Sequence, residues 1–157
     1  MVPVEKLIPY VNNARKHSEQ QVSQIAASIK EFGFVNPILI DAENVLIAGH
    51  GRLAAAHKLG LKEVPCLRVE HLTEAQKRAY ILADNKLAEL SEWDNELLSV
   101  EFSHLKELGF DSSLTGFSEA EIVSFTEEKN FNPGTEDDQG KLDEKAKHQC
   151  PSCGHEF

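Results

Sequence analysis

Several features that would settle the class of a protein are missing from this sequence. No run of residues is long and apolar enough to span a membrane, and Met1 is not followed by the pattern of a signal peptide. Only three cysteines are present, which is typical of a reducing compartment rather than of a disulfide framework. We therefore expect a soluble, cytoplasmic protein with no membrane partner.

Positive charge is also scarce. Sixteen Lys and Arg residues stand against 26 Asp and Glu residues, for a net charge of −10. The deficit is uneven, because residues 1–68 carry eight basic and six acidic side chains, whereas residues 69–157 carry eight and twenty. An anionic ligand therefore suits the first half of the chain, and net charge alone does not support DNA contact by the whole monomer.

Known phosphate-binding and catalytic motifs are absent as well. The stretch Ala48-Gly49-His50-Gly51-Arg52 lacks the third glycine of a dinucleotide fingerprint and the Gly-Lys-Ser/Thr of a P-loop. Nor is there a paired-carboxylate motif of the kind that a metal-dependent nuclease needs. Any function must therefore be argued from weaker patterns.

The stretch that organises the chain runs from residue 37 to residue 67. It has the pattern of strand, glycine-bracketed turn, helix and strand, with apolar strands at 37–40 and 45–48 and an alanine-rich helix from Arg52. The first N–H groups of such a helix have no internal partner and attract anions. Arg52 at this positive helix end is unfavourable unless an anion lies in front of it. Two interpretations stay open here, a packing turn with a surface arginine or a phosphate site.

Helices are expected on both sides of this stretch. Ser18 with Gln21, and Thr73 with Gln76, have the spacing of capping boxes and predict helices over 18–32 and from 73 to about 90. Asp94 and Ser118 are expected to cap two further helices. In the second helix the residues expected to face inward are Ala75, Ala79, Leu82, Ala83, Leu87 and Leu90, and in the third they are Leu97, Leu98, Leu105 and Leu108.

Two polar features interrupt these patterns. The loop 12–17 ends in Arg15, Lys16 and His17, the most basic part of the chain, and is interpreted either as solvated or as part of a binding site. Asp84 and Asn85 lie together in the long helix, although both residue types disfavour helix interiors.

Several of these motifs together resemble a known family. Leu7 to Tyr10, residues 12–17, the helix end at residues 28–33, Pro37-Ile38, and residues 48–56 through Val64-Pro65 are similar to the ParB N-terminal domain, often labelled ParB-like nuclease. The resemblance covers roughly residues 3–90 and is greatest to the phage and methyltransferase-associated type. It implies an α/β fold of the ParB/sulfiredoxin class, a small mixed sheet with flanking helices.

The resemblance also implies a ligand. Partition ParB proteins bind CTP, and the matching positions for the phosphates are Arg15, Gly49, His50, Gly51 and Arg52, with His17 as a further candidate beside them. Asp84 and Asn85 match the pair that holds Mg²⁺ near the phosphates, and a carboxylate with an amide oxygen suits that ion. His50 and Gly51 depart from the family's Glu and Arg, so nucleotide binding is expected more firmly than CTP specificity or hydrolysis. The two histidines act either as acid and base or as donors to phosphate.

The remaining expectations concern organisation and partners. We expect a ParB-like domain over 1–90, a helical extension over 91–126, a linker over 127–147 and a knuckle over 148–157. Residues 94–125 are acidic and short, so the DNA-reading helix-turn-helix of partition ParB is expected to be absent. Alternatives to a nucleotide-binding protein acting in DNA processing are a metal-dependent nuclease and a non-enzymatic adaptor for a partner such as a DNA methyltransferase. DNA contact is then indirect or through an oligomer.

The C-terminal end carries a separate metal pattern. Cys150 and Cys153 have the spacing of one zinc knuckle, and His148 and His155 are the nearest candidates to complete four ligands. Three interpretations stay open: zinc held within one chain, zinc shared between two chains, or no metal. A redox role for the two cysteines is weaker, because no helix of a thioredoxin-like fold follows them.

Overall fold

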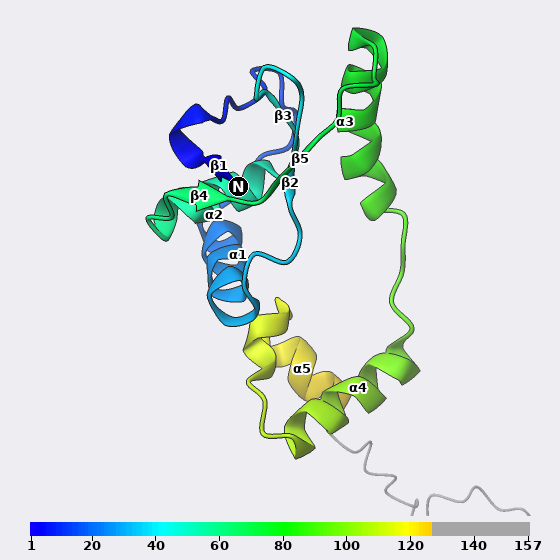
Figure 1. The fold of residues 1–157 in the computed structure, drawn as a ribbon. Coiled ribbons are helices and arrows are strands. Elements are labelled where there is room, and N and C mark those ends of the chain that lie inside the picture. Colours follow the sequence, from blue (N-terminus) through cyan, green and yellow to red (C-terminus); the bar gives the residue numbers. More distant parts are fainter. Residues whose placement is uncertain (127–157) are drawn as a thin grey trace, which may run out of the picture. The chain divides into compact units, whose positions relative to one another are not determined.

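The computed structural model of the chain describes residues 1–126. Two small sheets and five α-helices make up this part (Figure 1). None of its helices is long and apolar enough to cross a membrane. The mixed α/β class expected from the sequence is confirmed, since β2 (Ile38–Ile40) pairs antiparallel with β3 (Leu46–Ala48) and parallel with β5 (Cys66–Arg68).

The second sheet is formed by the start of the chain. Strand β1 (Val2–Pro3) pairs antiparallel with β4 (Glu63–Val64), and a 3-10 turn, η1 (Val4–Lys6), follows β1. Around Leu7 and Ile8 the chain forms only a single bridge, between Ile8 and Val45. The apolar pair is too short to extend a ladder, and Pro9 cannot donate to one.

The core lies between the three-stranded sheet and α2 (His50–Lys58). Its fully buried members include Ile38, Ile40, Leu46 and Val64, together with Ala56 of α2. Burying an aliphatic side chain of this size contributes about 1.5–3 kcal/mol. Both faces of β2 and β3 are largely buried, as their continuous apolar runs predict, so the end of β3 is held firmly where it meets α2.

Helix α1 (Glu19–Phe32) packs against α2 (Figure 1). Ser18 caps it, accepting from the N–H of Gln21 at 3.1 Å. The reciprocal half of the expected capping box is not formed, because the Gln21 side chain contacts Nδ1 of His17 at 3.0 Å instead. This contact holds the His17 ring in place.

Helix α3 (Glu74–Ala88) presents a different face from the one expected. Its capping box of Thr73 and Gln76 is formed in both directions. Its inward stripe, however, is Lys77, Ile81 and Asn85, one residue per helical turn, and only Ile81 is fully buried. Most of the predicted inward residues are wrong: Leu82, Leu87 and Leu90 are at least 60% exposed, Ala75 and Ala79 are exposed too, and only Ala83 is half-buried. Asp84 and Asn85 do not interrupt the helix either.

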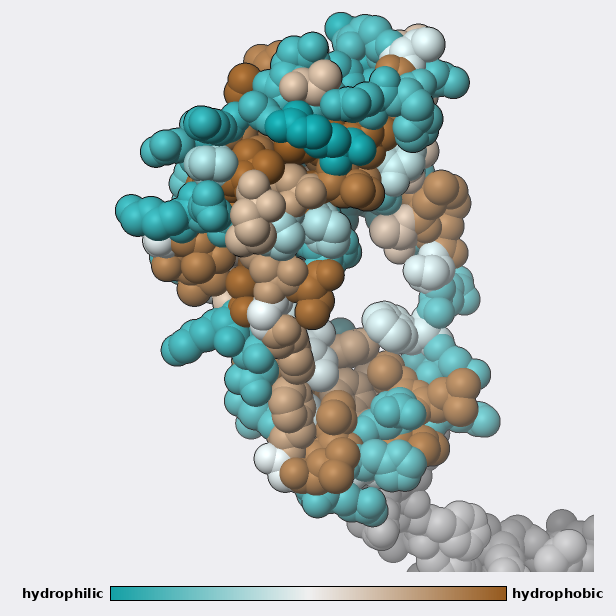
Figure 2. All heavy atoms as spheres, viewed as in Figure 1, coloured by the Kyte–Doolittle hydropathy of each residue, from teal (hydrophilic) through white to brown (hydrophobic). Residues whose placement is uncertain are grey.

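The last helices form a small cluster of their own. Helix α4 (Asn95–Glu107) is capped by Asp94, a 3-10 turn, η2 (Ser112–Thr115), follows, and α5 (Glu119–Thr126) comes after Ser118. Phe102 is buried against Phe117 and Phe125, with ring centroids 5.3 and 5.8 Å apart. Leu97 and Leu108, expected inward, are exposed, because Phe102 occupies the inner face. Figure 2 shows apolar surface over α4 and over the C-terminal half of α3.

Candidate functional site

The N-terminus of α2 is an open anion-binding end. Gly49 precedes the helix in the left-handed conformation, with φ 99° and ψ 26°, which favours glycine. The first turn closes through the Leu53 N–H, which donates to the Gly49 carbonyl at 2.9 Å. The N–H groups of residues 50–52 therefore have no helical acceptor, and no side chain caps them.

Arg52 lies over this helix end. Its guanidinium leaves no room for a side chain at position 49, since a Cβ there would lie 2.9 Å from Nη2. Its Nε is buried and has no hydrogen-bond partner within residues 1–126. Burial lowers the pKa of Arg52, and the nearby Asp84 carboxylate partly offsets this shift. The guanidinium therefore lies at a positive helix end, an arrangement that an anionic ligand would stabilise.

His17 packs against the first turn of α2 because Gly51 has no side chain to occupy that space. A Cβ at Gly51 would lie 2.9 Å from Cδ1 of Ile25 and 3.1 Å from the His17 ring. Position 51 therefore excludes a side chain in favour of the imidazole. The Gln21 contact holds the same ring from the other side. Sequence reasoning missed Gln21, whose spacing from His17 is hidden by its capping pattern with Ser18.

His50 is fixed in its neutral form. Its Nε2 accepts a hydrogen bond from the Tyr10 N–H at 3.3 Å, so the proton of the neutral ring resides on Nδ1. Partial burial lowers the pKa of His50, and the charge of neighbouring His17 lowers it further. Near neutral pH the ring therefore offers one donor and no net charge.

These side chains converge on one cavity of about 170 Å³, which we call the Arg52 pocket. It unites the turn, the loop 12–17 and α3, three segments that are far apart in sequence. All eight residues expected to bind phosphate or magnesium line it. The complete lining is Asn13, Arg15, His17, Ile25, Ala48, Gly49, His50, Gly51, Arg52, Asp84 and Asn85.

The metal-binding potential of the pocket rests on α3. Nδ2 of Asn85 donates to the Ile81 carbonyl at 2.8 Å, which leaves Oδ1 as an acceptor beside the Asp84 carboxylate. Within residues 1–126 there is no group of three or more His, Cys, Asp and Glu side chains arranged to hold a metal by themselves. The pair fits Mg²⁺ only as a partial ligand set, completed by phosphate oxygens and water.

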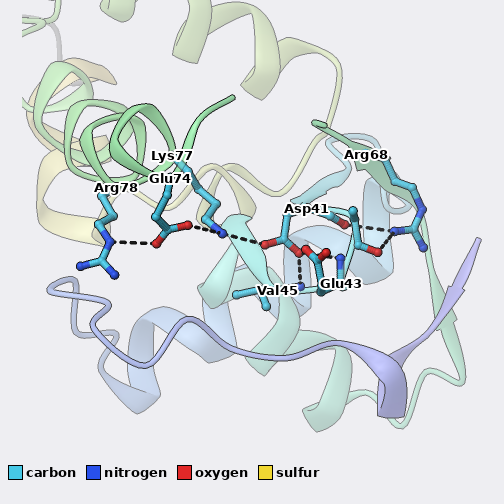
Figure 3. Close-up of polar contacts among 8 residues, drawn as sticks. Asp41, Glu43, Val45, Arg68, Glu74, Lys77 and Arg78 are labelled. Atoms are coloured by element: carbon cyan, nitrogen blue, oxygen red, sulfur yellow. Dashed lines mark hydrogen bonds and ion pairs between the residues drawn. The ribbon is translucent and has the colours of Figure 1, made fainter. Parts of the chain in front are cut away.

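Lys77 of α3 forms an ion pair with the buried Asp41 carboxylate in the β2–β3 turn (Figure 3). Nζ of Lys77 donates to Oδ2 of Asp41 at 2.9 Å, and the N–H groups of Glu43 and Val45 donate to Oδ1. Burial raises the pKa of Asp41, but the Lys77 and backbone hydrogen bonds outweigh it, so the pKa is lowered. Arg68 of β5 holds the other side of the same β2–β3 turn. Sequence reasoning did not find this pair.

A larger cavity of about 410 Å³ adjoins the Arg52 pocket. The two share Ile25 and Arg52. Its walls are mostly apolar, with amide side chains from Gln21, Gln24 and Asn36, and η2 forms one side. Sequence reasoning missed this space, because it depends on how η2 packs on α1.

The sequence and the fold of the chain are similar to those of known proteins. The family model of the ParB N-terminal domain matches residues 1–86, more than half of the chain. The chain belongs to the ParB N-terminal domain family. The ParB-like nuclease domain-containing protein YnaK of Escherichia coli K12 is 49% identical over 76 residues, which is 48% of this chain and 87% of YnaK.

Partition proteins are more distant relatives of this ParB domain. A probable chromosome-partitioning protein ParB of Campylobacter jejuni is 34% identical over 89 residues, or 54% of this chain. The match spans 32% of that protein. The crystal structure of Caulobacter crescentus ParB complexed with CTP-γ-S superposes with a TM-score of 0.63 at 21% identity, over 78% of this chain and 73% of that one. This last likeness shows the ParB fold.

The comparisons also correct one expectation. The family model of the ParB-methyltransferase helix-turn-helix domain matches residues 96–151, so such a domain follows the ParB domain. The sequence had argued against a helix-turn-helix because residues 94–125 are acidic and the segment is short. Net charge does not define a helix-turn-helix, however, and the matched segment continues beyond residue 125. His148, Cys150, Cys153 and His155 lie outside the described residues, and their zinc site stays a prediction.

Proposed function

We propose that this ParB-like chain binds a nucleoside triphosphate together with Mg²⁺ in the Arg52 pocket, with CTP as the first candidate. The observation that carries the proposal is the position of the Arg52 guanidinium over the uncapped N-terminus of α2, in a cavity that Arg15 also lines. Phosphate oxygens supply the acceptors that both groups lack. Asp84 and Asn85 line the same pocket, and their carboxylate and amide oxygens would hold the ion.

The cavities suggest how such a ligand divides between them. The smaller Arg52 pocket is lined by cations and backbone N–H groups and suits the phosphates. The adjoining cavity, with apolar walls and amide side chains, has the chemistry of a nucleoside site. Arg52 lies on the boundary of both. Membership of the ParB family and the CTP-γ-S complex of the Caulobacter protein support the same ligand class.

Calorimetric titration tests the proposal directly. The full chain is titrated with CTP, ATP, GTP and UTP, each with Mg²⁺ and each with EDTA. We expect saturable binding of at least one triphosphate and a loss of roughly 10- to 100-fold in Arg52→Met, since a charge-assisted hydrogen bond contributes about 1.5–3 kcal/mol. Arg78→Met is the matched control, because Arg78 pairs on the surface with Glu74 outside the pocket.

Two results would contradict nucleotide binding in the Arg52 pocket. One is the absence of saturation by all four nucleotides, and the other is equal affinity in wild type and Arg52→Met. The role of Mg²⁺ is tested separately with Asp84→Asn. This variant is expected to bind the nucleotide with the same affinity in Mg²⁺ and in EDTA. If its affinity still differs between the two, Asp84 is not a ligand.

A nuclease activity has less support from the site. The name of the Escherichia coli relative mentions a nuclease domain, yet within residues 1–126 no carboxylate cluster accompanies Asp84. Incubation with supercoiled plasmid and Mg²⁺ or Mn²⁺ distinguishes the two functions, and we expect no nicking. The helix-turn-helix match favours association with DNA, directly or through a partner such as a methyltransferase.

A further inference from the structure

Arg15 has two possible anionic partners, and one of them belongs to the protein. It lines the Arg52 pocket and also an adjoining cavity of about 200 Å³ that Glu89 borders. Nη1 of Arg15 donates to Oε1 of Glu89, the residue directly after α3. Oε2 of Glu89 accepts from Lys86 at 3.1 Å. One of the two arginines that line the Arg52 pocket is therefore already paired.

We propose that Glu89 competes with the ligand phosphates for Arg15, so that it lowers the affinity of the Arg52 pocket and links the end of α3 to the ligand-free state. The proposal rests on the proposed function for the nature of the ligand, a triphosphate. It concerns the affinity-determining role of Glu89, which no pattern in the sequence indicated.

Charge and geometry support competition rather than sharing. A guanidinium makes its best contacts with one carboxylate or phosphate at a time, through a planar fork of donors. A triphosphate near Arg15 also brings several negative charges toward the Glu89 carboxylate, which repel it. The hydrogen bond from Lys86, and then that from Arg15, lowers the pKa of Glu89, which keeps the carboxylate charged near neutrality.

The opposite role is also physically possible and gives the opposite sign. Glu89 could hold Arg15 in the orientation that phosphate needs, as a supporting residue. Removing the carboxylate would then weaken binding. Competition predicts tighter binding, and a purely structural role of Glu89 would not improve affinity.

The test compares Glu89→Gln with wild type in calorimetric titration. The probes are the Mg²⁺ complex of the triphosphate that wild type binds, and tripolyphosphate, which has no base. Because both side chains are about 40% exposed, the expected gain is modest, about two- to fivefold at low salt, and shrinks in 0.5 M KCl. In the Arg15→Gln background, Glu89→Gln is expected to add nothing.

Glu92→Gln is the matched control. It removes the same charge three residues further on, and Glu92 has no ion pair among residues 1–126 and borders neither cavity. An equal gain in Glu92→Gln overturns the proposal, because net charge alone would then explain the effect. Unchanged or weaker binding by Glu89→Gln overturns it too.

The two probes separate this proposal from the proposed function. Tighter tripolyphosphate binding by Glu89→Gln without binding of any nucleotide supports the competition and contradicts the nucleotide ligand. Nucleotide binding that is indifferent to Glu89→Gln supports the ligand and contradicts the competition. If wild type and variant bind none of the probes, both proposals are wrong.

Discussion

At the scale of single residues, the Arg52 pocket depends on two glycines without side chains as much as on the side chains that line it. Gly49 and Gly51 carry no side chain, and the two spaces are taken by the guanidinium of Arg52 and the ring of His17. A charged group is thereby held against the backbone at a helix end where no protein acceptor is available. This arrangement costs stability in the absence of ligand, and ligand binding can return that free energy.

His50 makes the free energy of unfolding depend on pH. Its pKa is lowered by burial first and by His17 second, so the folded state binds its proton less readily than the unfolded state does. The free energy of unfolding is therefore expected to fall as pH drops through the ordinary histidine range, about 6.5, toward the lower folded value. Urea unfolding at pH 7.5, 6.5 and 5.5 measures this slope.

The variant His50→Gln is the control for that measurement. Glutamine keeps an acceptor for the Tyr10 N–H but does not titrate, so the slope between pH 7.5 and 5.5 should become smaller. Carboxylates such as Asp41, whose pKa is lowered, act only at more acidic pH. An unchanged slope in His50→Gln would show that another group causes the dependence.

At the scale of elements, α3 is fixed to the sheet by a polar contact. Lys77 donates to the buried Asp41 at one end of the inward stripe, and the pair Asp84 and Asn85 lies near its other end. Lys77→Met leaves the Asp41 carboxylate without its only side-chain donor among the described residues. We expect a loss of about 1.5–3 kcal/mol in the free energy of unfolding, together with weaker Mg²⁺-dependent nucleotide binding.

Two variants give that prediction its controls. Lys77→Arg keeps the charge and should recover part of both losses. Arg78→Met removes the neighbouring exposed pair with Glu74 and should change stability far less. If Lys77→Met unfolds at the wild-type urea concentration, the ion pair does not hold α3. If stability falls while Mg²⁺-dependent binding is unchanged, the pair stabilises the fold without positioning the site.

Sequence patterns predict where these helices begin and end, but not which face of α3 is buried. Caps and glycines locate the helices well, because a Thr or Asp at an N-terminus acts through local backbone bonds. The face of α3 could not be found this way. Its leucines suggested the inward stripe, yet the helix buries Ile81 and pairs Lys77 with Asp41, a contact between residues 36 apart that no local pattern records. The Arg52 pocket was predicted because a family resemblance supplied the long-range pairing that periodicity lacks.

At the scale of the whole molecule, the ParB domain and the helix-turn-helix domain differ in charge. The basic side chains that could meet an anion are concentrated in residues 1–68, whereas residues 96–151 carry thirteen acidic side chains and five lysines. Several cations of the first part are engaged, among them Arg15 with Glu89 and Arg68 with the β2–β3 turn. Few positive charges remain to release counterions from DNA.

This imbalance predicts weak DNA binding by a single chain with a shallow dependence on salt. Each phosphate that a protein neutralises on duplex DNA contributes about −0.9 to the slope of log K against log salt. We expect a slope no steeper than about −4 and dissociation constants at the weak end of the non-specific range of roughly 10⁻⁴ to 10⁻⁶ M. Fluorescence anisotropy with a 30-base-pair duplex between 50 and 200 mM KCl measures both, with and without the triphosphate and Mg²⁺.

Tight binding with a steep slope at low protein concentration would contradict the charge argument. A steepening that appears only at higher protein concentration would show instead that several chains assemble to supply the missing cations.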